Sequence, residues 1–405
     1  MPLEGIRVCD LSWVITGPYC TQIMAEMGAE VIRIESQQRL DNYRDARTWP
    51  RGWADNIPGV NRGGTFNSCN LSKKSCTLDL TRPEGLALAQ SIAKVSDVVV
   101  ESFGTGVAER LGLSYATLKE VKPDIIMLSA SVLGRTGPDR GHVGMGPVLI
   151  GLTGLQAITG YPGGRPSRIG GTWPDFMSAL AAATAILFAL HHRRRTGEGQ
   201  YIDLALSETT ISLMPEPIMD YVLNGRVWGG TGNRDPRHAP QGVYPCLGED
   251  KWVAIAVSCE EEWQALARAL GHPEWLAGPR FANEERRRQN QDELDKLISQ
   301  WTRERTDYEA MKTLQEAGVP AGPSLNNQDL VAEPHLAERD FFARVDHPEV
   351  GERVYVGLPW KFTPALSPRY EHAPLLGQHN GYVLEELLGL PSSEVRRLTE
   401  DGVIY

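Results

Sequence analysis

Short apolar runs alternate with amphipathic segments through the first 130 residues of the chain. Residues 6–11, 30–34, 97–101 and 124–129 are runs of strand length rich in β-branched side chains, whereas 19–27, 84–95 and 114–121 have helical spacing. Apolar strands separated by helices are typical of a parallel sheet that is covered on both faces. The pattern therefore predicts an α/β fold with a largely parallel, doubly wound sheet.

The longest apolar segment follows a glycine- and proline-rich region, 134–173, which we expect to pass over the surface or to line a site. Residues 176–190 are almost wholly apolar, with Pro174 and Asp175 before them and the basic run 191–195 after them. These 15 residues are fewer than the roughly 20 that span a bilayer. We therefore predict a buried core helix that ends in a solvated basic turn, where cations complement the helix dipole.

Composition changes after residue 224, where a glycine-rich and basic loop begins. Residues 243–246 and 252–257 then have the pattern of a hairpin, and 260–270, 291–303 and 307–317 have helical spacing. We expect a large domain from 1–200, a linker at 201–224, a smaller α+β domain at 225–325, and a return to the large domain at 326–405.

Charge and cysteine content exclude several classes of protein. The 405 residues carry a formal net charge of −10 with a pI near 5.5, so neither nucleic acid nor an anionic membrane is an expected partner. The first residues lack the pattern of a signal peptide, which predicts a cytoplasmic protein. Six cysteines include no C-x-x-C pair, and no cluster has metal-ligand spacing, so we expect neither disulfides nor a bound metal.

Three positions are candidates for chemistry, each with a structural alternative. The turn 12–18 lacks the G-x-G-x-x-G fingerprint of NAD-binding proteins, and is either an anion site at a helix start or an ordinary turn. Asp175, before the apolar helix, is either its N-cap or an ionised nucleophile that flanking glycines leave accessible. His142, in a glycine-rich loop, is either a general base or a structural residue.

Several motifs, taken together and in order, resemble family III CoA-transferases, the group of formyl-CoA and carnitine CoA-transferases. They cover nearly the whole chain and comprise Gly17-Pro-Tyr, Gly28-Ala-Glu-Val-Ile-Arg-Ile-Glu, Leu78-Asp-Leu-Thr-Arg-Pro-Glu-Gly, Val100-Glu-Ser-Phe-Gly-Thr-Gly, Arg110-Leu-Gly-Leu, and Asp175 ahead of Arg195-Thr-Gly-Glu-Gly-Gln. The resemblance implies a Rossmann-like large domain that binds coenzyme A as a co-substrate, with no metal. It also implies an interlocked, ring-like dimer, formed by two copies or with a related second subunit.

The resemblance assigns Asp175 the role of covalent nucleophile, acting through an aspartyl anhydride and an aspartyl-CoA thioester. The positions that match the family's CoA contacts are Ile15, Thr16, Gln37, Leu78, Asp79, Thr81, Ser102, Phe103, Gly104, Arg110, Val143 and Met145. A loop containing Gly229, Gly230 and Gly232 resembles the loop that shields the anhydride from water. Arg110 is the expected phosphate partner. Two positions depart from the pattern of some family members: Ile15 stands where they have Gln, and Gln37 stands where they have Arg. Arg39 or Arg44 is a candidate to take the place of the arginine missing at position 37.

Two other functions fit the same fold. An α-methylacyl-CoA racemase would need a histidine that aligns with Met145, three residues after His142, and a non-catalytic subunit would not need Asp175. Within the transferases, the segment Gly-Gly-Thr-Trp-Pro-Asp-Phe and the loop Arg-His-Ala-Pro resemble relatives that activate substituted succinates, such as benzylsuccinate, with succinyl-CoA. An aromatic pocket for such an acceptor would be lined by Trp173, Phe176 and Trp228, and its second carboxylate would be bound by Arg234 or Arg237. The alternative is that these five side chains are ordinary packing and surface residues.

Overall fold

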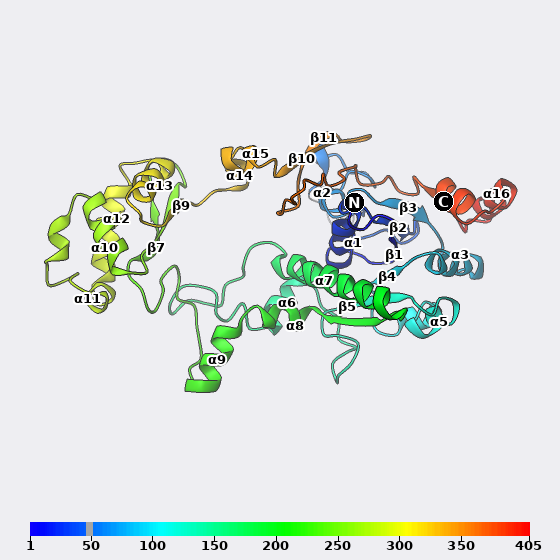
Figure 1. Ribbon diagram of the computed structural model, residues 1–405, viewed down its shortest axis with the longest axis horizontal. Helices are drawn as coiled ribbons and strands as arrows, with labels where there is room; N and C mark the ends of the chain where they lie inside the picture. The colour runs from blue at the N-terminus through cyan, green and yellow to red at the C-terminus, as the bar shows by residue number, and fades with distance from the viewer. Residues whose placement is uncertain (46–51) are drawn as a thin grey trace. The chain divides into compact units, whose positions relative to one another are not determined.

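The computed structural model describes residues 1–45 and 52–405 and divides the chain into two compact units (Figure 1). The first unit comprises Met1–Leu155, Ile169–Gly225 and Asp340–Tyr405. The second comprises Gln156–Arg168 and Arg226–Arg339. Residues 201–224, expected as a linker, contribute a strand and two helices to the first unit, and the second unit runs past the expected end at residue 325.

A six-stranded, wholly parallel sheet forms the centre of the first unit, which confirms the predicted α/β class. Its strands are β1 (Arg7–Asp10), β2 (Glu30–Glu35), β3 (Lys74–Thr77), β4 (Val98–Glu101), β5 (Ile126–Ser131) and β6 (Tyr201–Ala205). The hydrophobic pattern identified four of them and missed β3 and β6. The strands lie in the order β3-β2-β1-β4-β5-β6, so successive strands are added on one side of β1 up to β3 and on the other side from β4 onward. Doubly wound sheets bind their ligands at this switch point, beside the carboxyl ends of the two strands that flank it, here β1 and β4.

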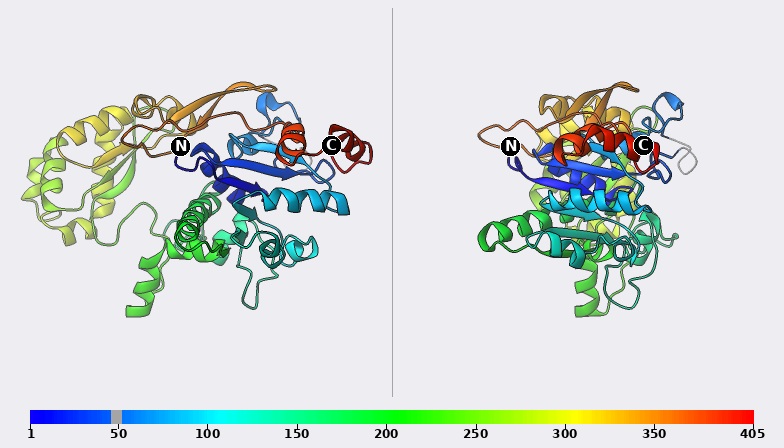
Figure 2. Two further views of the ribbon diagram at one scale, coloured as in Figure 1. Left: turned by 45° about the vertical axis from the view of Figure 1, so that its right-hand side comes forward. Right: turned by 90° about the vertical axis from the view of Figure 1, so that its right-hand side faces the viewer.

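Successive strand residues point to opposite faces of this sheet, and each face has its own apolar core (Figures 1 and 2). Val8 packs with Cys20 and Met24 of α1 (Thr16–Glu26) and with Ala182 and Ile186 of α7 (Trp173–Thr196). The opposite face packs against α3 (Pro83–Lys94), α5 (Tyr115–Val121), a π-helical turn (Tyr382–Leu387) and α16 (Ser392–Glu400). C-terminal residues thus complete the core that the N-terminal strands begin.

The first unit also contains several shorter elements. They are a 3-10 turn (Ala54–Asn56), α2 (Gly64–Ser68), α4 (Val107–Arg110), α6 (Gly146–Leu152), α8 (Leu206–Ser212), α9 (Pro215–Asn224) and the antiparallel pair β10 (Phe342–His347) and β11 (Gly351–Val356). Five cysteines are buried and Cys259 is exposed, and all six are free thiols.

Helix α7 is longer than the sequence pattern predicted. It has 24 residues because the basic run continues the helix to Thr196, and Gly197 ends it in a left-handed conformation. The predicted length of 15 residues is wrong, and so is the argument that the helix is too short for a bilayer: among the described residues α7 is long and apolar enough to cross one. Its alanine-rich face is nevertheless buried on the sheet, as expected of a core helix.

The second unit is an antiparallel sheet covered by helices, as its sequence pattern predicts. Strands β7 (Gln241–Pro245), β8 (Trp252–Ala256) and β9 (Ala321–Pro323) pair in that order. The helices are α10 (Glu260–Ala269), a 3-10 turn (Pro273–Leu276), α11 (Glu284–Gln289), α12 (Gln291–Thr302), α13 (Asp307–Glu316), α14 (Asn327–Val331) and α15 (Pro334–Glu338). Trp263 lies at the centre of a separate apolar core, so this unit has a core of its own.

Candidate active site

The turns that follow β1 and β4 meet at the point where the strand order reverses. Trp13, three residues after β1, donates its backbone N–H to the Ser102 hydroxyl, which follows β4, over 2.9 Å. Ile15 is the N-cap residue of α1, and Thr16 is its first residue. The fold therefore brings Ile15 and Thr16 to the same sheet edge as Ser102, Phe103 and Gly104, although they lie almost ninety positions apart in sequence.

Asp175 lies in the first turn of α7, beside the start of α1. Thr172 is the N-cap residue, so the prediction that Asp175 caps the helix is wrong. Asp175 is 9% exposed; Oδ1 lies 3.5 Å from the Thr16 hydroxyl, and Oδ2 has no hydrogen-bond partner among the described residues. A buried carboxylate oxygen without a partner is costly, and such strain is characteristic of functional sites.

Burial raises the pKa of Asp175 to about 6, and a hydrogen bond from its own backbone N–H and one from the Thr16 hydroxyl oppose that shift. At neutral pH the side chain is still mainly ionised, yet water solvates it poorly. The start of a helix favours the ionised form of a carboxyl group, and poor solvation makes that anion more reactive toward a carbonyl carbon. The arrangement suits nucleophilic attack by Asp175.

Glycine at position 146 leaves the space that the Asp175 carboxylate fills. A Cβ atom built on Gly146, the first residue of α6, would lie 2.8 Å from Asp175 Oδ2. The preceding residue, Met145, is the N-cap residue of α6, at the position where the family resemblance would place a racemase histidine. A thioether cannot take a proton from carbon, so this position offers no base for a racemase.

We expect Gly146→Ala to lower kcat for CoA transfer by about 10- to 100-fold, because a small displacement of a nucleophile is costly. Only the end of the Asp175 side chain must move, so the free energy of unfolding should change by less than about 1 kcal/mol. Gly141→Ala, in the same loop but with open space around its Cβ, is the matched control. Equal kinetics for the two variants would contradict a role for this close approach.

The remaining predicted CoA contacts lie in different environments. Gln37, Arg110, Val143 and Met145 are exposed, and so remain available to a ligand. Leu78 is fully buried in the core, so only its backbone could face a ligand. Asp79 accepts hydrogen bonds from the backbone and hydroxyl of Thr81, over 2.9 and 2.6 Å, and therefore shapes the turn after β3.

The two arginines proposed to replace the family's arginine at position 37 differ in their exposure to solvent. Arg44 is buried and forms a two-pronged ion pair with Glu35, over 2.7 and 2.9 Å, so it is not available to a phosphate. Arg39 is exposed and lies over the Trp13 ring, with its guanidinium carbon 5.2 Å from the ring centroid. Arg39 is the remaining candidate, and the suggestion of Arg44 is wrong.

The predicted glycine loop lies in the second unit and packs on another turn of that unit. Gly232 donates its backbone N–H to the carbonyl of Gly160 over 2.8 Å, and a Cβ on Gly230 would lie 2.3 Å from the same oxygen. Arg234 in this loop already pairs with Asp292 and Asp295, over 2.6 and 2.5 Å. Arg237 pairs with Asp235 over 3.3 Å, so both proposed carboxylate-binding arginines have acidic partners within the unit.

Other candidates have ordinary structural environments. His142 is largely exposed and lies 3.7 Å from Asp139, another exposed side chain. In the basic end of α7, Arg193 pairs with Asp97 over 2.8 Å, whereas Arg194 and Arg195 are exposed. No cluster of three or more metal-ligating side chains occurs among residues 1–45 and 52–405.

Comparison with known proteins identifies the family. Residues 3–380 match the family model described as CoA-transferase family III. The chain belongs to CoA-transferase family III. The family and the enzyme class implied by the sequence motifs are thereby confirmed, and CoA thioesters are the co-substrates of CoA-transferases.

This CoA-transferase is similar to two curated relatives from Chloroflexus aurantiacus. It is 35% identical to succinyl-CoA–D-citramalate CoA-transferase, over 100% of this chain and 98% of the relative. It is 31% identical to the succinyl-CoA–L-malate CoA-transferase alpha subunit, over 100% of this chain and 93% of the relative. A CaiB/BaiF family protein from Brucella suis has a similar structure, with a TM-score of 0.86, 30% identity, and coverage of 96% of this chain and 99% of that one.

Proposed function

We propose that this CoA-transferase moves CoA from succinyl-CoA to a dicarboxylic acid of the succinate type, with Asp175 as the covalent nucleophile. The observation that carries the proposal is the buried Asp175 carboxylate, whose Oδ2 atom has no hydrogen-bond partner within the described part of the chain and lies where glycine at 146 leaves room. The succinyl-CoA donor is supported by the names of both relatives.

The transfer takes place in four acyl exchanges. Asp175 attacks the thioester carbonyl of the donor and expels CoA thiolate, which leaves a mixed anhydride. The thiolate attacks the Asp175 carbonyl, giving an aspartyl-CoA thioester and free succinate. The acceptor carboxylate then attacks this thioester and expels CoA thiolate, which leaves a second mixed anhydride. The thiolate attacks the acceptor carbonyl of that anhydride and expels the Asp175 carboxylate. Acceptor acyl-CoA and the Asp175 carboxylate are released, and each step exchanges one activated acyl bond for another.

The CoA moiety would lie at the sheet edge where β1 and β4 end. The exposed Arg110 and Arg39 offer charge to its phosphates, while Ser102 and Gly104 offer a turn that a ligand can approach. A phosphate contact at Arg110 affects donor and acceptor thioesters alike because both carry the same CoA. Arg110→Ala should therefore raise KM for both by a similar factor of about 3 to 10 and leave kcat within about twofold; a large loss of kcat would contradict the assignment.

The acceptor class rests on the chemistry shared by the relatives' named substrates. Malate and citramalate are both succinates that carry a hydroxyl group, and benzylsuccinate extends the same dicarboxylate with an aromatic ring. A coupled assay with succinyl-CoA should compare malate, citramalate, glutarate and benzylsuccinate with acetate. Preference for a monocarboxylate would contradict the proposed class, and deuterium exchange at the α-carbon without transfer would indicate a racemase instead.

We also propose that the chain functions in an interlocked dimer, with a second copy or with a related subunit. Helix α9 has no buried residue, and Tyr221, Val222 and Leu223 on it are exposed apolar side chains. Such a helix is a poor surface for a monomer in water. The name of the malate relative as an alpha subunit supports the two-subunit alternative. The molar mass of the chain expressed alone, measured by light scattering, distinguishes a homodimer from a monomer that requires a second subunit.

A further inference from the structure

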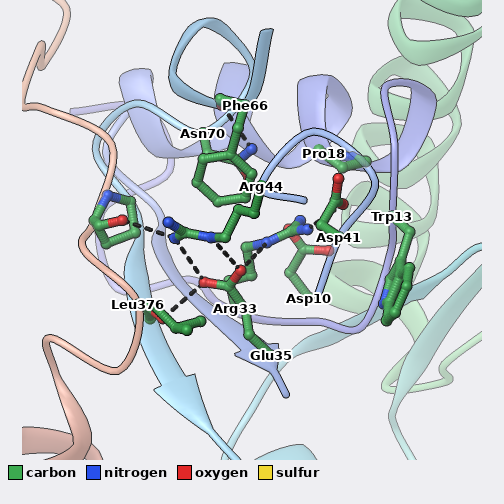
Figure 3. A network of polar contacts seen from close by, with 12 residues as sticks. Asp10, Trp13, Pro18, Arg33, Glu35, Asp41, Arg44, Phe66, Asn70 and Leu376 are labelled. Carbon is green, nitrogen blue, oxygen red and sulfur yellow. Dashed lines mark hydrogen bonds and ion pairs between the residues drawn. The ribbon is translucent and has the colours of Figure 1, made fainter. Parts of the chain in front are cut away.

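A buried network of six charged side chains lies beneath the turn that follows β1. We call it the buried charge network: three carboxylates and three cations, namely Asp10, Glu35, Asp41, Arg33, Arg44 and Lys73. Figure 3 labels Asp10, Arg33, Glu35, Asp41 and Arg44 from this network. Equal numbers of opposite charges make such burial tolerable, since an unpaired charge at these positions would be far more costly. The network as a whole supports the turn from which Thr16 approaches Asp175.

Asp41 is the member of the network that reaches this turn directly. Its Oδ2 atom accepts hydrogen bonds from Arg33 Nη2, over 2.8 Å, and from the backbone N–H of Val14, over 3.0 Å. Its Oδ1 atom accepts one from the backbone N–H of Tyr43, over 2.9 Å. A single buried carboxylate therefore joins strand β2, the turn after β1 and its own loop.

Arg33 fixes the orientation of the Asp41 carboxylate. Its other two nitrogens, Nη1 and Nε, lie 3.6 Å from Asp10 and 3.6 Å from Glu35, and neither forms a hydrogen bond with residues 1–45 or 52–405. The bond to Asp41 is thus the short, charge-assisted contact of this buried guanidinium. An anion at position 41 has the geometry to hold Arg33 and the Val14 N–H at the same time.

Val14 needs such a restraint because its backbone is strained. Its φ is +72°, in the left-handed region that β-branched residues rarely adopt. A conformation of this kind persists only where surrounding contacts hold it. The hydrogen bond from the Val14 N–H to Asp41 is such a contact.

The strained residue directs the chain toward the nucleophile. Two residues after Val14, Thr16 begins α1 with its hydroxyl 3.5 Å from Asp175 Oδ1. Ile15 and Tyr43 are buried in one apolar cluster, against which Phe176 of α7 packs. Both segments that Asp41 holds therefore lie next to the first turn of α7.

We propose that Asp41 is a positioning residue that holds Val14 in its left-handed conformation and thereby places the Thr16 hydroxyl against Asp175. This inference rests on the proposed role of Asp175 as nucleophile. Asp41 itself need not touch substrate, because it acts through the turn. In the transfer reaction the Thr16 hydroxyl can donate to Asp175 Oδ1 and leave Oδ2 to attack the thioester.

The first test is kinetic. Asp41→Asn should lower kcat by about 10- to 100-fold while KM for succinyl-CoA changes by less than about threefold, because the nucleophile is misplaced and the CoA groove is intact. In a Thr16→Val background the same change should lower kcat by less than about twofold, since Asp41 acts through Thr16. In a Val14→Gly background its effect should also shrink, because glycine adopts this φ without strain. An equal loss in all three backgrounds would overturn the proposal.

The second test does not depend on transferase activity. The folded-state titration of Asp175 can be obtained from the pH dependence of unfolding, comparing each protein with the same protein carrying Asp175→Asn. Asp175 interacts with its own backbone N–H, with the Thr16 hydroxyl and with Tyr43, and loss of the Thr16 contact in Asp41→Asn should move the pKa of Asp175 upward by about half a unit to one unit. An unchanged titration would overturn the proposal even if the wild-type protein proved unable to transfer CoA.

A further variant covers the case in which Asp41→Asn removes the short ion pair of Arg33, leaving only the 3.6 Å contacts with Asp10 and Glu35, and the protein does not fold. Val14→Pro forbids the left-handed conformation and removes the N–H, but keeps the Asp41–Arg33 ion pair. It should reproduce both the loss of kcat and the upward shift of the Asp175 titration. Wild-type values for Val14→Pro would overturn the proposal.

Discussion

Asp175→Asn is expected to abolish CoA transfer and, at the same time, to stabilise the folded protein at pH 8. Asparagine has the same shape but cannot form the anhydride or the aspartyl-CoA thioester, so kcat should fall by at least about 10⁴-fold. Incubation with succinyl-CoA and hydroxylamine should give a hydroxamate at Asp175 in the wild-type protein and none in the variant, as measured by mass spectrometry.

The stability gain follows from the sign of the pKa shift. Burial raises the pKa of Asp175 from 3.8 to about 6, so the charged form destabilises the folded state. Well below pH 3.8 the carboxyl group is protonated in both the folded and the unfolded state, and the variant should gain nothing. The gain should grow between pH 3.8 and 6 and level off above, at about 2 to 3 kcal/mol at most. Urea unfolding at about pH 3 and at pH 8 measures the difference.

Asp307→Asn is the matched control for the loss of transfer. Asp307 is also a buried aspartate in the first turn of a helix, and its Oδ2 atom likewise has no hydrogen-bond partner among the described residues, but it lies in the second unit on α13. Its substitution should leave kcat unchanged. A loss of transfer in Asp307→Asn comparable with that in Asp175→Asn would show that the assay reports damage to the fold and would contradict the nucleophile assignment.

Arg44→Met is expected to cause the largest loss of stability in the buried charge network, about 3 to 5 kcal/mol, because it leaves the Glu35 carboxylate buried without its main partner. Arg44 contacts Glu35 through two nitrogens and also donates to Asn61 Oδ1 and to the carbonyl of Pro374, both over 2.8 Å. Its guanidinium carbon lies 3.6 Å from the centroid of the Phe66 ring (Figure 3). The free energy of unfolding in urea measures the loss.

Two further variants test whether the loss of stability comes from the broken Arg44–Glu35 ion pair or from the loss of an arginine at any position. Arg44→Met combined with Glu35→Gln should be less destabilised than the sum of the single changes, because no unpaired charge remains. Arg39→Met should change stability by less than about 1 kcal/mol, since Arg39 is exposed. If Arg39→Met destabilised the protein as much as Arg44→Met, the assignment of Arg44 to the fold and of Arg39 to the ligand surface would be wrong.

The hydrophobic pattern predicted what depends on neighbours in sequence. Runs such as 97–101 and 124–129 became central strands because apolar β-branched stretches of that length bury well on both faces. The strand 74–77 was missed because Lys74 and Ser75 interrupt its apolar character: Ser75 donates to Glu35 within the buried charge network, and Lys74 stacks on Tyr382. Tertiary partners, absent from a local pattern, made these polar residues part of a sheet.

By itself the sequence determined the α/β class, the family through its ordered motifs, and Asp175 as the candidate nucleophile. The tertiary structure alone decided the surroundings of that residue: Thr16 is 159 positions from it, and Gly146 reaches it from another helix. It also decided that Arg44 is structural, through a contact with residue 374, 330 positions away. Secondary structure and motifs follow from short-range sterics and periodicity, whereas burial and charge pairing depend on which distant segments the folded chain brings together.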